Sequence, residues 1–465
     1  MGRAATSSMR AQGEGLVSAL VAGPTEDKVQ ELQRTLYRAA KAEPGRRFHV
    51  LYDKVHRRDV LERAWEQVRR NGGASGIDRT TITDVEHYGA DLLLDELATD
   101  LKEETYRPLP ARRVFIPKPG RQEKRPLSIP TVRDRVVQAA LKIVIEPVFE
   151  ADFRLASFGF RPKKAAHDAL QVLLDESFRG RRFVVETDIA DCFSTIPHEQ
   201  LMSAVGERIC DRKVLKLLRA MLHSGVMEDG AVRHAVTGTP KGGVISPLLC
   251  NVYLNRLDRE WETTGQGVLV RYADDLVAMC SSRAEADRAL QRLTVLLGDL
   301  GLAPKADKTR IVHLVEGGEG FDFLGFHHRL VRARGRTGAR RFVFLARWPS
   351  RRATQHARDR LRELTARSRL LVPVEQVVGS LNRFLRGWAG FFKVGNSAKM
   401  FDKIRSFALR RLGIFVANLH RRSRRWGLHY VLRDPEHLGL VNLNGLVVAP
   451  RPNYAWRALV AEHRR

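Results

Sequence analysis

The sequence predicts an α+β fold in which helices accompany antiparallel hairpins and an all-α domain follows. Two hairpin patterns support this prediction: apolar runs flank a basic turn near residue 120 and an acidic turn near residue 274. The third observation is a change of pattern after about residue 329, where arginines are dense and apolar residues then recur at helical spacing. Strands in the first part of a chain and helices in the last part are typical of this class.

The charge of the chain points to a polyanionic partner. Lys and Arg number 80 and Asp and Glu number 53, so the formal net charge is +27. The excess positive charges repel one another in the folded state unless a polyanion neutralises them. Nucleic acid is such a polyanion, because each phosphate that a basic side chain neutralises releases counterions and strengthens binding. An anionic membrane is the competing partner, but the sequence has no apolar run of about 18 residues.

Cysteine usage and the start of the chain favour a reducing compartment. The cysteines at 192, 210, 250 and 280 show no Cys-x-x-Cys spacing, so neither a zinc site nor a disulfide framework is expected. The segment from Met1 to Gly23 lacks the charged and apolar parts of a secretory signal. We therefore expect a cytoplasmic protein.

Helices and short strands alternate in the first 280 residues. Glycines supply backbone freedom in the loop at 71–76, and Pro117 ends a strand before the basic turn. The predicted elements are helices at 29–36 and 60–68, strands at 114–116 and 127–129, helices at 133–145 and 165–174, and strands at 183–185, 268–270 and 276–279.

The last third of the chain is predicted to be helical. Apolar residues recur three and four positions apart from Val374 to Phe392 and again from Phe401 to Leu419. Pro373 suits the first turn of a helix. We expect the apolar faces to point inward and basic side chains to point outward, among them Arg383, Arg386 and Lys393.

Three acidic residues form the candidate site. Asp188 follows an apolar strand, and Asp274 and Asp275 occupy the tip of a hairpin, where a tight turn can bring both carboxylates toward one place. Phosphoryl transfer needs metal ions that hold the reacting oxygens in line, and hard oxygen ligands select Mg²⁺. A Tyr-Ala-Asp-Asp turn by itself could be only polar, but the apolar strands on both sides place these acids beside a core.

Further sequence blocks occur in the order of one known family. Residues 271–276 (Arg-Tyr-Ala-Asp-Asp-Leu) and 184–193 (Val-Val-Glu-Thr-Asp-Ile-Ala-Asp-Cys-Phe) look like the two acidic boxes of reverse transcriptases. The other blocks lie at 71–76, 125–138, 158–162, 238–248, 301–308, 323–326 and 386–388. Together they resemble the group II intron-encoded reverse transcriptase/maturase family, of bacterial type, over roughly residues 28 to 430.

The resemblance implies a right-hand polymerase fold. Its expected divisions are an N-terminal extension at 1–50, fingers and palm with an antiparallel sheet and helices at 51–328, a basic all-α thumb/maturase domain at 329–430, and a short basic C-terminal segment at 431–465. No endonuclease domain is expected. The C-terminal segment, with Trp426 and Tyr430 before it and Tyr454 within it, could contact DNA or form a small capping lobe.

The implied activity is RNA-directed DNA polymerisation in a bacterial cytoplasm or nucleoid. The implied partners are an RNA template, which would be group II intron RNA, a DNA primer or target DNA, and deoxynucleoside triphosphates, without a membrane. Assistance in splicing or mobility of the intron RNA is implied as well. The oligomeric state stays open.

The resemblance also implies roles for the acidic residues. Asp188, Asp274 and Asp275 would bind two Mg²⁺ ions, for which Mn²⁺ could substitute, and the Ile189 carbonyl would be a further ligand. Lys308 would act as general acid toward the leaving pyrophosphate.

Other residues would contact nucleotide, primer and template. Lys118, Arg125, Phe193 and Lys241 would contact the incoming nucleotide, with Phe193 as a steric gate against a ribose 2′-hydroxyl or else a core residue. The primer end and the template would be held by Phe323, Leu324, Gly325, Arg383, Arg386 and Lys393, although residues 323–326 could also be a buried strand.

Departures from the family pattern leave alternatives open. Lys241 stands where the family usually has Gln, which puts nucleotide affinity or sugar selection in doubt, although a longer cation could reach a phosphate. The alternatives are a non-catalytic RNA-binding splicing maturase, a reverse transcriptase recruited to host defence or DNA repair, and an RNA-copying RNA polymerase. The complete set of three acids argues against the first, and Phe193 argues against the last.

Overall fold

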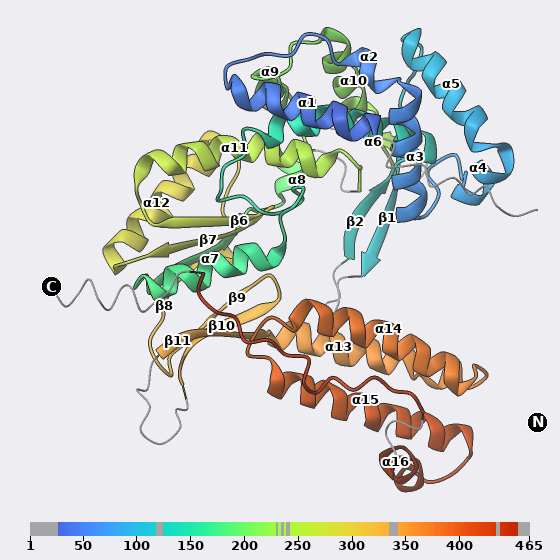
Figure 1. The fold of residues 1–465 in the computed structure, drawn as a ribbon, viewed down its shortest axis with the longest axis vertical. Helices are drawn as coiled ribbons and strands as arrows, with labels where there is room; N and C mark the ends of the chain where they lie inside the picture. The colour runs from blue at the N-terminus through green and yellow to red at the C-terminus, as the bar shows by residue number, and fades with distance from the viewer. Residues whose placement is uncertain are drawn as a thin grey trace, which may run out of the picture.

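The computed structural model describes residues 27–117, 124–228, 231–233, 237–238, 242–333, 343–433 and 438–453. Its elements form a mainly helical region with a small sheet, a central antiparallel sheet with helices on both faces, and a helical bundle (Figure 1). This arrangement confirms the predicted α+β class with a helical C-terminal region. Within the described ranges, no helix is both long and apolar enough to cross a membrane.

The first region is built around one buried helix. Helix α6 (Val132–Glu150) is buried on nearly every side, and a helix that is apolar all round must be covered by other elements. Helices α1 (Lys28–Ala42) and α3 (Arg58–Asn71) cover it, and the Gln33 side-chain amide donates to the Ile143 carbonyl at 3.1 Å. The other helices here are α2 (Tyr52–Val55), α4 (Ile82–Tyr88), α5 (Ala90–Lys102), α9 (His198–Gly206) and α10 (Arg212–His223).

A four-stranded sheet in the order β2-β1-β4-β5 extends from this region. Strands β1 (Ala111–Pro117) and β2 (Lys124–Ile129) are antiparallel, which confirms the predicted strand pair around the basic turn. Strand β4 (Val226–Glu228) runs parallel to β1, and β5 (Ala231–Arg233) pairs with β4.

The central sheet has the antiparallel order β6-β7-β3-β8. Its strands are β3 (Phe183–Asp188), β6 (Val268–Tyr272), β7 (Asp275–Cys280) and β8 (Arg310–His313). Successive residues of a strand face opposite sides. Val185 therefore packs in the core cluster with residues of α11 (Ser246–Thr264) and α12 (Arg283–Asp299), whereas Val184 packs in a second cluster with residues of α7 (Ala166–Phe178).

A three-stranded sheet connects the central sheet to the helical bundle. Its order is β11-β10-β9, formed by β9 (Phe321–Phe323), β10 (Phe326–Arg332) and β11 (Val343–Pro349). The sequence analysis treated residues 329–352 only as a basic stretch, and this was incomplete. The stretch contains most of β10, all of β11 and the start of a helix, because apolar residues such as Leu330 and Leu345 alternate with the arginines and are buried.

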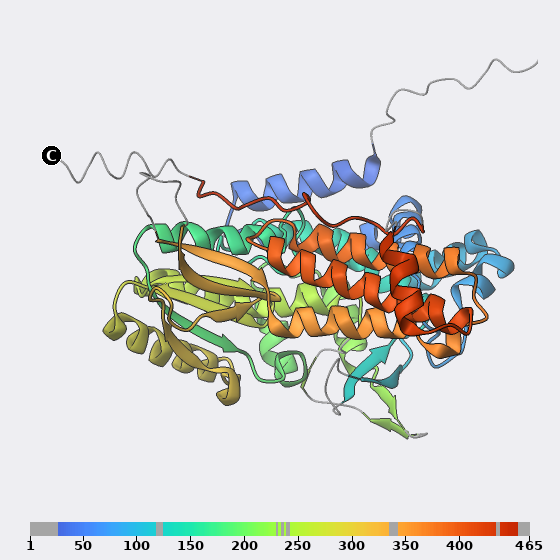
Figure 2. The same cartoon turned by 90° about the horizontal axis from the view of Figure 1, so that it is seen from below.

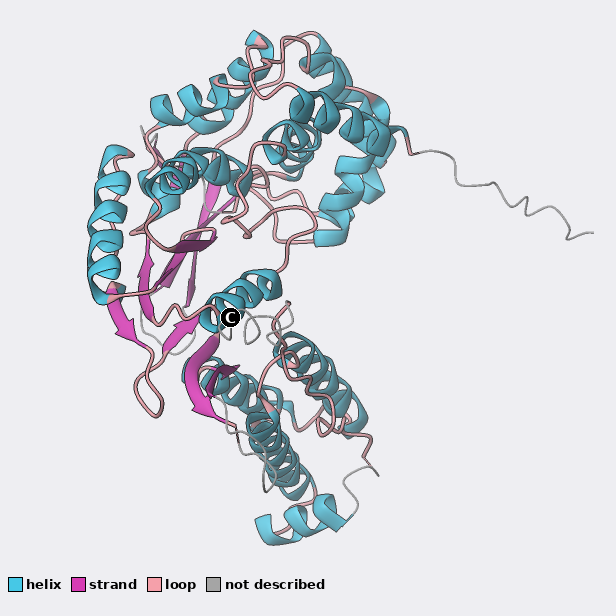
Figure 3. Ribbon diagram, turned by 60° about the vertical axis from the view of Figure 1, so that its left-hand side comes forward, coloured by secondary structure: helices cyan, strands magenta, loops and turns pink. Residues whose placement is uncertain are grey.

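Four helices form the C-terminal bundle (Figure 3). Helices α14 (Val374–Phe392) and α15 (Ala398–Leu419) confirm the two predicted helices, with Pro373 at the N-cap of α14 instead of in its first turn. The sequence analysis did not predict α13 (Arg351–Leu364) as a helix. Ser350 caps it through a hydrogen bond from the Ala353 N–H at 3.1 Å. Helix α16 (Arg424–Arg433) packs on α15.

The described C-terminal segment, residues 438–453, runs back from the bundle to the central sheet (Figures 1 and 2). Val448 forms a parallel bridge with Val394, and the Gln171 side chain on α7 donates to the Arg451 carbonyl at 2.8 Å. The predicted domain divisions at 50, 328 and 430 stay predictions. Residues 28–50 pack on the first region, and β10 spans residue 328.

Candidate active site

The acidic hairpin and the end of β3 lie side by side. Asp188, the last residue of β3, is directly opposite Asp275, the first residue of β7. Between β6 and β7 the chain turns through Ala273, whose φ of +57° lies in the left-handed region, and Asp274. The Ile189 N–H donates to the Asp274 carbonyl at 3.0 Å, so the turn is tied to the residue after Asp188.

Lys308 is the direct partner of Asp188. It belongs to the short 3₁₀ helix η1 (Ala306–Lys308), and its ammonium group forms an ion pair with the Asp188 carboxylate. The Lys305 N–H donates to the Asp188 carbonyl at 2.8 Å, which fixes η1 beside β3. The structure therefore brings together two residues that the sequence analysis assigned to one site.

Asp275 lies in an environment that disfavours its charge. Burial, followed by the neighbouring charges of Asp274 and Glu186, raises the pKa of Asp275 to about 6, while Arg352 acts in the opposite direction. Burial also raises the pKa of Glu186, although its carboxylate accepts a hydrogen bond from Arg310 at 2.9 Å. The charged forms of Asp275 and Glu186 are thus both disfavoured, chiefly by burial.

The donor chemistry here fits a hard divalent cation. Asp188 and Asp275 are opposite one another. Burial, and after it the charges of Asp274 and Glu186, disfavour the charged form of Asp275, and a bound cation would favour that form. As they stand, no three His, Cys, Asp or Glu side chains in the described residues are gathered closely enough to hold a metal ion. Asp188 is instead paired with Lys308. The predicted ligand set, Ile189 included, stays a prediction.

A cleft of about 850 Å³ opens over these residues. Asp188 and Asp275 line it from the central sheet, and Lys308 lines it from η1. The turn between β9 and β10 contributes three of the residues assigned to the primer end, Phe323, Leu324 and Gly325. Leu324 and Gly325 both have positive φ, and the Gly325 carbonyl accepts a hydrogen bond from the Ser350 N–H at 2.8 Å. This bond joins the turn to the start of α13.

One helix that lines the cleft was not predicted from the sequence. Helix α13 contributes Arg351, Arg352, Gln355, His356 and Asp359, whose spacing places them on one helical face. Trp388 and Phe392, on the apolar face of α14, also line it. The sequence did contain a signal for this helix: Ser350 is a suitable N-cap, and basic residues follow it at helix positions 1, 2 and 6.

Two of the four residues predicted to contact the nucleotide lie within the described residues. Lys118 and Lys241 lie outside the described residues. Arg125 is exposed on β2, and Phe193 is half-buried on the short helix α8 (Cys192–Thr195). A Cβ on Gly242 would lie 2.4 Å from the Ser128 carbonyl of β2, and the Gly238 N–H donates to the Ile196 carbonyl at 2.8 Å. The described residues at either end of 238–242 therefore approach β2 and the segment after α8.

The basic residues predicted on α14 lie elsewhere. Arg383 lines a second groove, of about 690 Å³, together with Arg360 of α13 and Arg369 of the 3₁₀ helix η2 (Arg367–Arg369). Arg386 and Lys393 are exposed and line neither the cleft nor this groove. The structure thus does not bring these three residues to the acidic site, and their contact with nucleic acid stays a prediction.

Two parts of the chain match known protein families. Residues 116–328 match the reverse transcriptase (RNA-dependent DNA polymerase) family, and residues 354–431 match the maturase-specific domain of group II introns. The first range contains the acidic site, and the second contains most of the C-terminal bundle.

Individual relatives cover the chain to different extents. It is 34% identical over 358 residues to protein YkfC of Escherichia coli (strain K12), covering 68% of this chain and 91% of YkfC. It is 36% identical over 212 residues to the group II intron-encoded protein LtrA of Lactococcus lactis subsp. cremoris, covering 46% of this chain and 35% of LtrA. A 91 kDa protein in the cob intron of Schizosaccharomyces pombe is 26% identical over 413 residues, covering 73% of this chain and 50% of that protein.

Site geometry, domain order and relatives agree, and the chain belongs to the group II intron-encoded reverse transcriptase/maturase family.

Proposed function

We propose that the protein is an RNA-directed DNA polymerase that extends a primer with deoxynucleotides on an RNA template. One observation carries the proposal: Asp188 and Asp275 lie opposite one another in the sheet and line a cleft that the basic face of α13 also lines. The acids suit phosphoryl transfer, and the cations suit a nucleic-acid backbone.

We assign the metal-binding role to Asp188, Asp274 and Asp275. Reverse transcriptases generally use divalent metal ions, and two Mg²⁺ ions, when bound, would stabilise the charge on the attacking and leaving oxygens. Asp274 and Asp275 belong to the hairpin, Asp275 is paired with Asp188 in the sheet, and Ile189 directly follows Asp188 in the chain. Asp188 would have to release Lys308, which could then donate a proton to the leaving pyrophosphate.

The remaining assignments concern the substrate. Lys118, Arg125 and Lys241 would contact the triphosphate, and Phe193 would exclude a ribose 2′-hydroxyl. The turn at Phe323, Leu324 and Gly325 supports a role at the primer end, because it lines the same cleft as the acids. Arg351 and Arg352 of α13 lie where they could contact the backbone of a bound duplex.

Primer extension tests the proposal directly. The wild type, Asp274→Ala and the exposed neighbouring control Asp307→Asn would be compared on an RNA template with deoxynucleotides and Mg²⁺. We expect synthesis by the wild type and the control, and a loss of at least about 10³-fold in Asp274→Ala. RNA affinity should change less than about twofold, because the hairpin acids do not themselves neutralise phosphate. Equal loss of synthesis and RNA affinity would mean that the acids are structural.

A second function is supported by the maturase-specific match. LtrA is by name encoded by a group II intron, and the second groove, lined by Arg360, Arg369 and Arg383, offers cations on the surface of the matched domain. We propose that this surface binds folded intron RNA and assists its splicing or mobility. If the wild type binds intron RNA tightly but never extends a primer, splicing assistance without polymerisation becomes the better description.

A further inference from the structure

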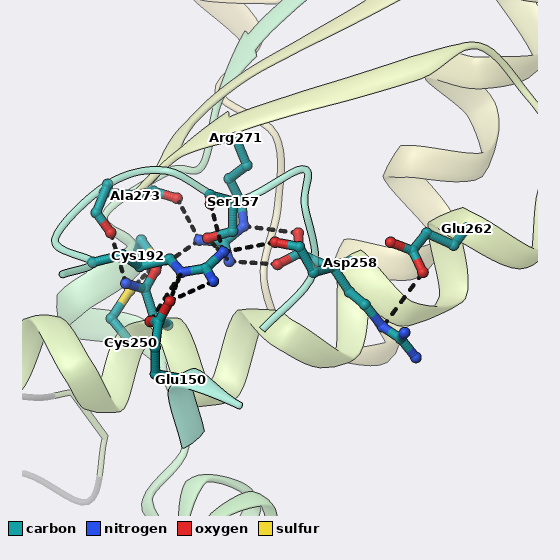
Figure 4. A network of polar contacts seen from close by, with 12 residues as sticks. Glu150, Ser157, Cys192, Cys250, Asp258, Glu262, Arg271 and Ala273 are labelled. Atoms are coloured by element: carbon teal, nitrogen blue, oxygen red, sulfur yellow. Dashed lines mark hydrogen bonds and ion pairs between the residues drawn. The ribbon is translucent and has the colours of Figure 1, made fainter. Parts of the chain in front are cut away.

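Arg271, the residue before the Tyr-Ala-Asp-Asp turn, is fully buried in an ion pair. Its side chain and that of Asp258, on α11, both have 0% exposure. The Arg271 Nε donates to Asp258 Oδ1 at 2.8 Å, and Nη2 donates to Oδ2 at 2.5 Å (Figure 4). A buried ion pair is weak evidence for stabilisation, because desolvation offsets the attraction between the charges. The geometry around this pair suggests another purpose.

The other three N–H groups of Arg271 also have partners. Nη1 donates to Asn251 Oδ1 at 2.9 Å and to the Ala273 carbonyl at 3.1 Å. Nη2 donates to Ser157 Oγ at 2.8 Å. A guanidinium has five N–H donors in a rigid plane, and here all five are used. A lysine has three donors on one atom and could not reach this set of acceptors together.

These partners surround the turn that carries the acids. Ala273 has a left-handed backbone, which is unfavourable for a residue with a side chain, and Asp274 follows it directly. The bond from Arg271 to the Ala273 carbonyl holds the turn from within its own hairpin. A fork that bonds to a strained turn and to a fixed helix at once can keep that turn in one conformation.

The segment at 156–159 closes the turn from the other side. The Arg271 N–H donates to the Ala156 carbonyl at 2.7 Å, and the Phe158 N–H donates to the Arg271 carbonyl at 2.9 Å. A Cβ on Gly159 would lie 2.5 Å from the Ala273 nitrogen, so only a glycine permits this approach. Asn251, already bonded to Arg271, donates to the Gly159 carbonyl at 2.8 Å. Three separate parts of the chain therefore meet at one guanidinium.

We propose that Arg271 is a positioning residue for the catalytic hairpin: its paired guanidinium holds the Ala273 turn, and with it the Asp274 and Asp275 carboxylates, against α11 and the 156–159 segment. The proposal rests on the proposed function, because it assigns the hairpin acids to catalysis. Arg271 touches no substrate in this arrangement. Its effect is transmitted through the Ala273 carbonyl and the backbone of the two residues that follow.

Two variants separate positioning from simple core stability. Arg271→Lys keeps a cation beside Asp258 but cannot make all five bonds. The double variant Arg271→Met with Asp258→Leu removes both charges, a replacement that is often tolerated in buried pairs. The matched control is Arg208→Lys. Arg208 is also buried and pairs with Asp152, and it donates to the Arg46 and Ala40 carbonyls at 3.0 Å, none of which is in the hairpin.

The two readouts are primer-extension kinetics and amide hydrogen exchange of the peptide that covers residues 268–280. Urea titration first shows that each variant is folded. For Arg271→Lys and for the double variant, we expect the turnover number to fall about 10- to 100-fold, since a shift of about 1 Å at reacting groups has that effect. The KM for nucleotide should change less than about threefold. Exchange of the hairpin amides should speed up in both, whereas Arg208→Lys should change neither the turnover number nor hairpin exchange.

The outcomes separate the two hypotheses. Turnover and hairpin exchange at wild-type values in folded Arg271→Lys would overturn the positioning role. A loss of turnover that only follows the folded fraction, equal in Arg208→Lys, would also overturn it. If the wild type itself does not extend a primer, the proposed function fails, but the exchange measurement still decides whether Arg271 holds the turn.

Discussion

At the scale of the residue, the charged form of Asp275 lowers the stability of the folded protein. Its pKa is raised to about 6 by burial and by the charges of Asp274 and Glu186. The folded protein therefore binds this proton more tightly than the unfolded chain does, for which the ordinary value is 3.8. By linkage, the contribution of Asp275 to stability is fully present below about pH 4 and is lost as the pH rises through 6.

Asp275→Asn should stabilise the protein while abolishing synthesis. Without added metal at pH 7.5, where the buried carboxylate is charged, we expect the free energy of unfolding to rise by roughly 1–3 kcal/mol. At pH 4.5 the gain should be much smaller, because Asp275 is then largely protonated in the folded wild type. Urea titrations at both pH values measure the difference. The exposed control Asp307→Asn should show no such pH dependence, and an equal gain at both pH values would contradict the assignment.

Phe193 offers a second test at the residue scale. It is half-buried on α8 and packs at the edge of the first core cluster, so a gate and a core role are both compatible with its position. Phe193→Ala should raise ribonucleotide incorporation relative to deoxynucleotide by about 10-fold or more if the ring excludes the 2′-hydroxyl. Competition between the two nucleotides in primer extension measures the ratio. An unchanged ratio with reduced stability would assign Phe193 to the core alone.

At the scale of the element, α13 shows how one helix joins two tasks. Its buried side, with Ala357 and Leu361, packs in the second core cluster, and its other side lines the cleft. The N-terminal cap at Ser350 and the hydrogen bond between Ser350 and Gly325 place that side opposite the acids. The position of the basic face is therefore set by packing and capping, and not by the cations themselves.

Removing one cation from this face should weaken duplex binding without regard to sequence. For Arg352→Gln, we expect the affinity for an RNA–DNA duplex to fall and the slope of log affinity against log salt concentration to decrease by about one. Fluorescence anisotropy over a range of KCl concentrations measures both. Arg34→Gln, on α1 and outside the cleft lining, is the matched control. Equal effects in the two variants would mean that general surface charge accounts for binding.

At the scale of the whole molecule, the second core cluster extends from the central sheet into the bundle. Val184 and Val277 of the sheet, and Leu381 and Phe415 of the bundle, belong to one set of packed residues. The segment at 438–453 adds polar bonds across the same junction. The Asn382 side chain donates to the Gly439 carbonyl at 2.7 Å and accepts from the Val441 N–H at 2.8 Å. The cleft thus lies between the central sheet and the bundle, which are joined both by the shared core cluster and by the hydrogen bonds of the 438–453 segment.

Weakening the attachment of the 438–453 segment should shorten the product made per binding event more than it slows the addition of a single nucleotide. Asn382→Leu removes both bonds, so we expect a loss of roughly 1–3 kcal/mol in stability and faster proteolysis near residue 440. The length of product per binding event should shorten, while single-nucleotide addition stays within about twofold. Gln376→Ala, at an exposed position of the same helix that lines neither the cleft nor the second groove, is the control. If proteolysis becomes faster but product length does not change, the segment does not stabilise the cleft.

Local patterns determined much of this protein. Continuous apolar runs on both sides of the acidic turn were sufficient for β6, β7 and the positions of Asp274 and Asp275, and three-and-four spacing was sufficient for α14 and α15. These signals are local because the periodicity of a strand or helix is a property of neighbouring residues. Charge and motif order were sufficient for the family.

Only the tertiary structure decided which distant residues are in direct contact. It paired Asp188 with Lys308, placed α13 instead of the outer face of α14 across the cleft, and joined Arg271 to Asp258, Ser157 and Asn251. Sequence alone could not predict these contacts, because it does not distinguish an arginine that becomes buried from one that stays exposed. Their partners are chosen by the packing of separate elements, which the local pattern does not contain.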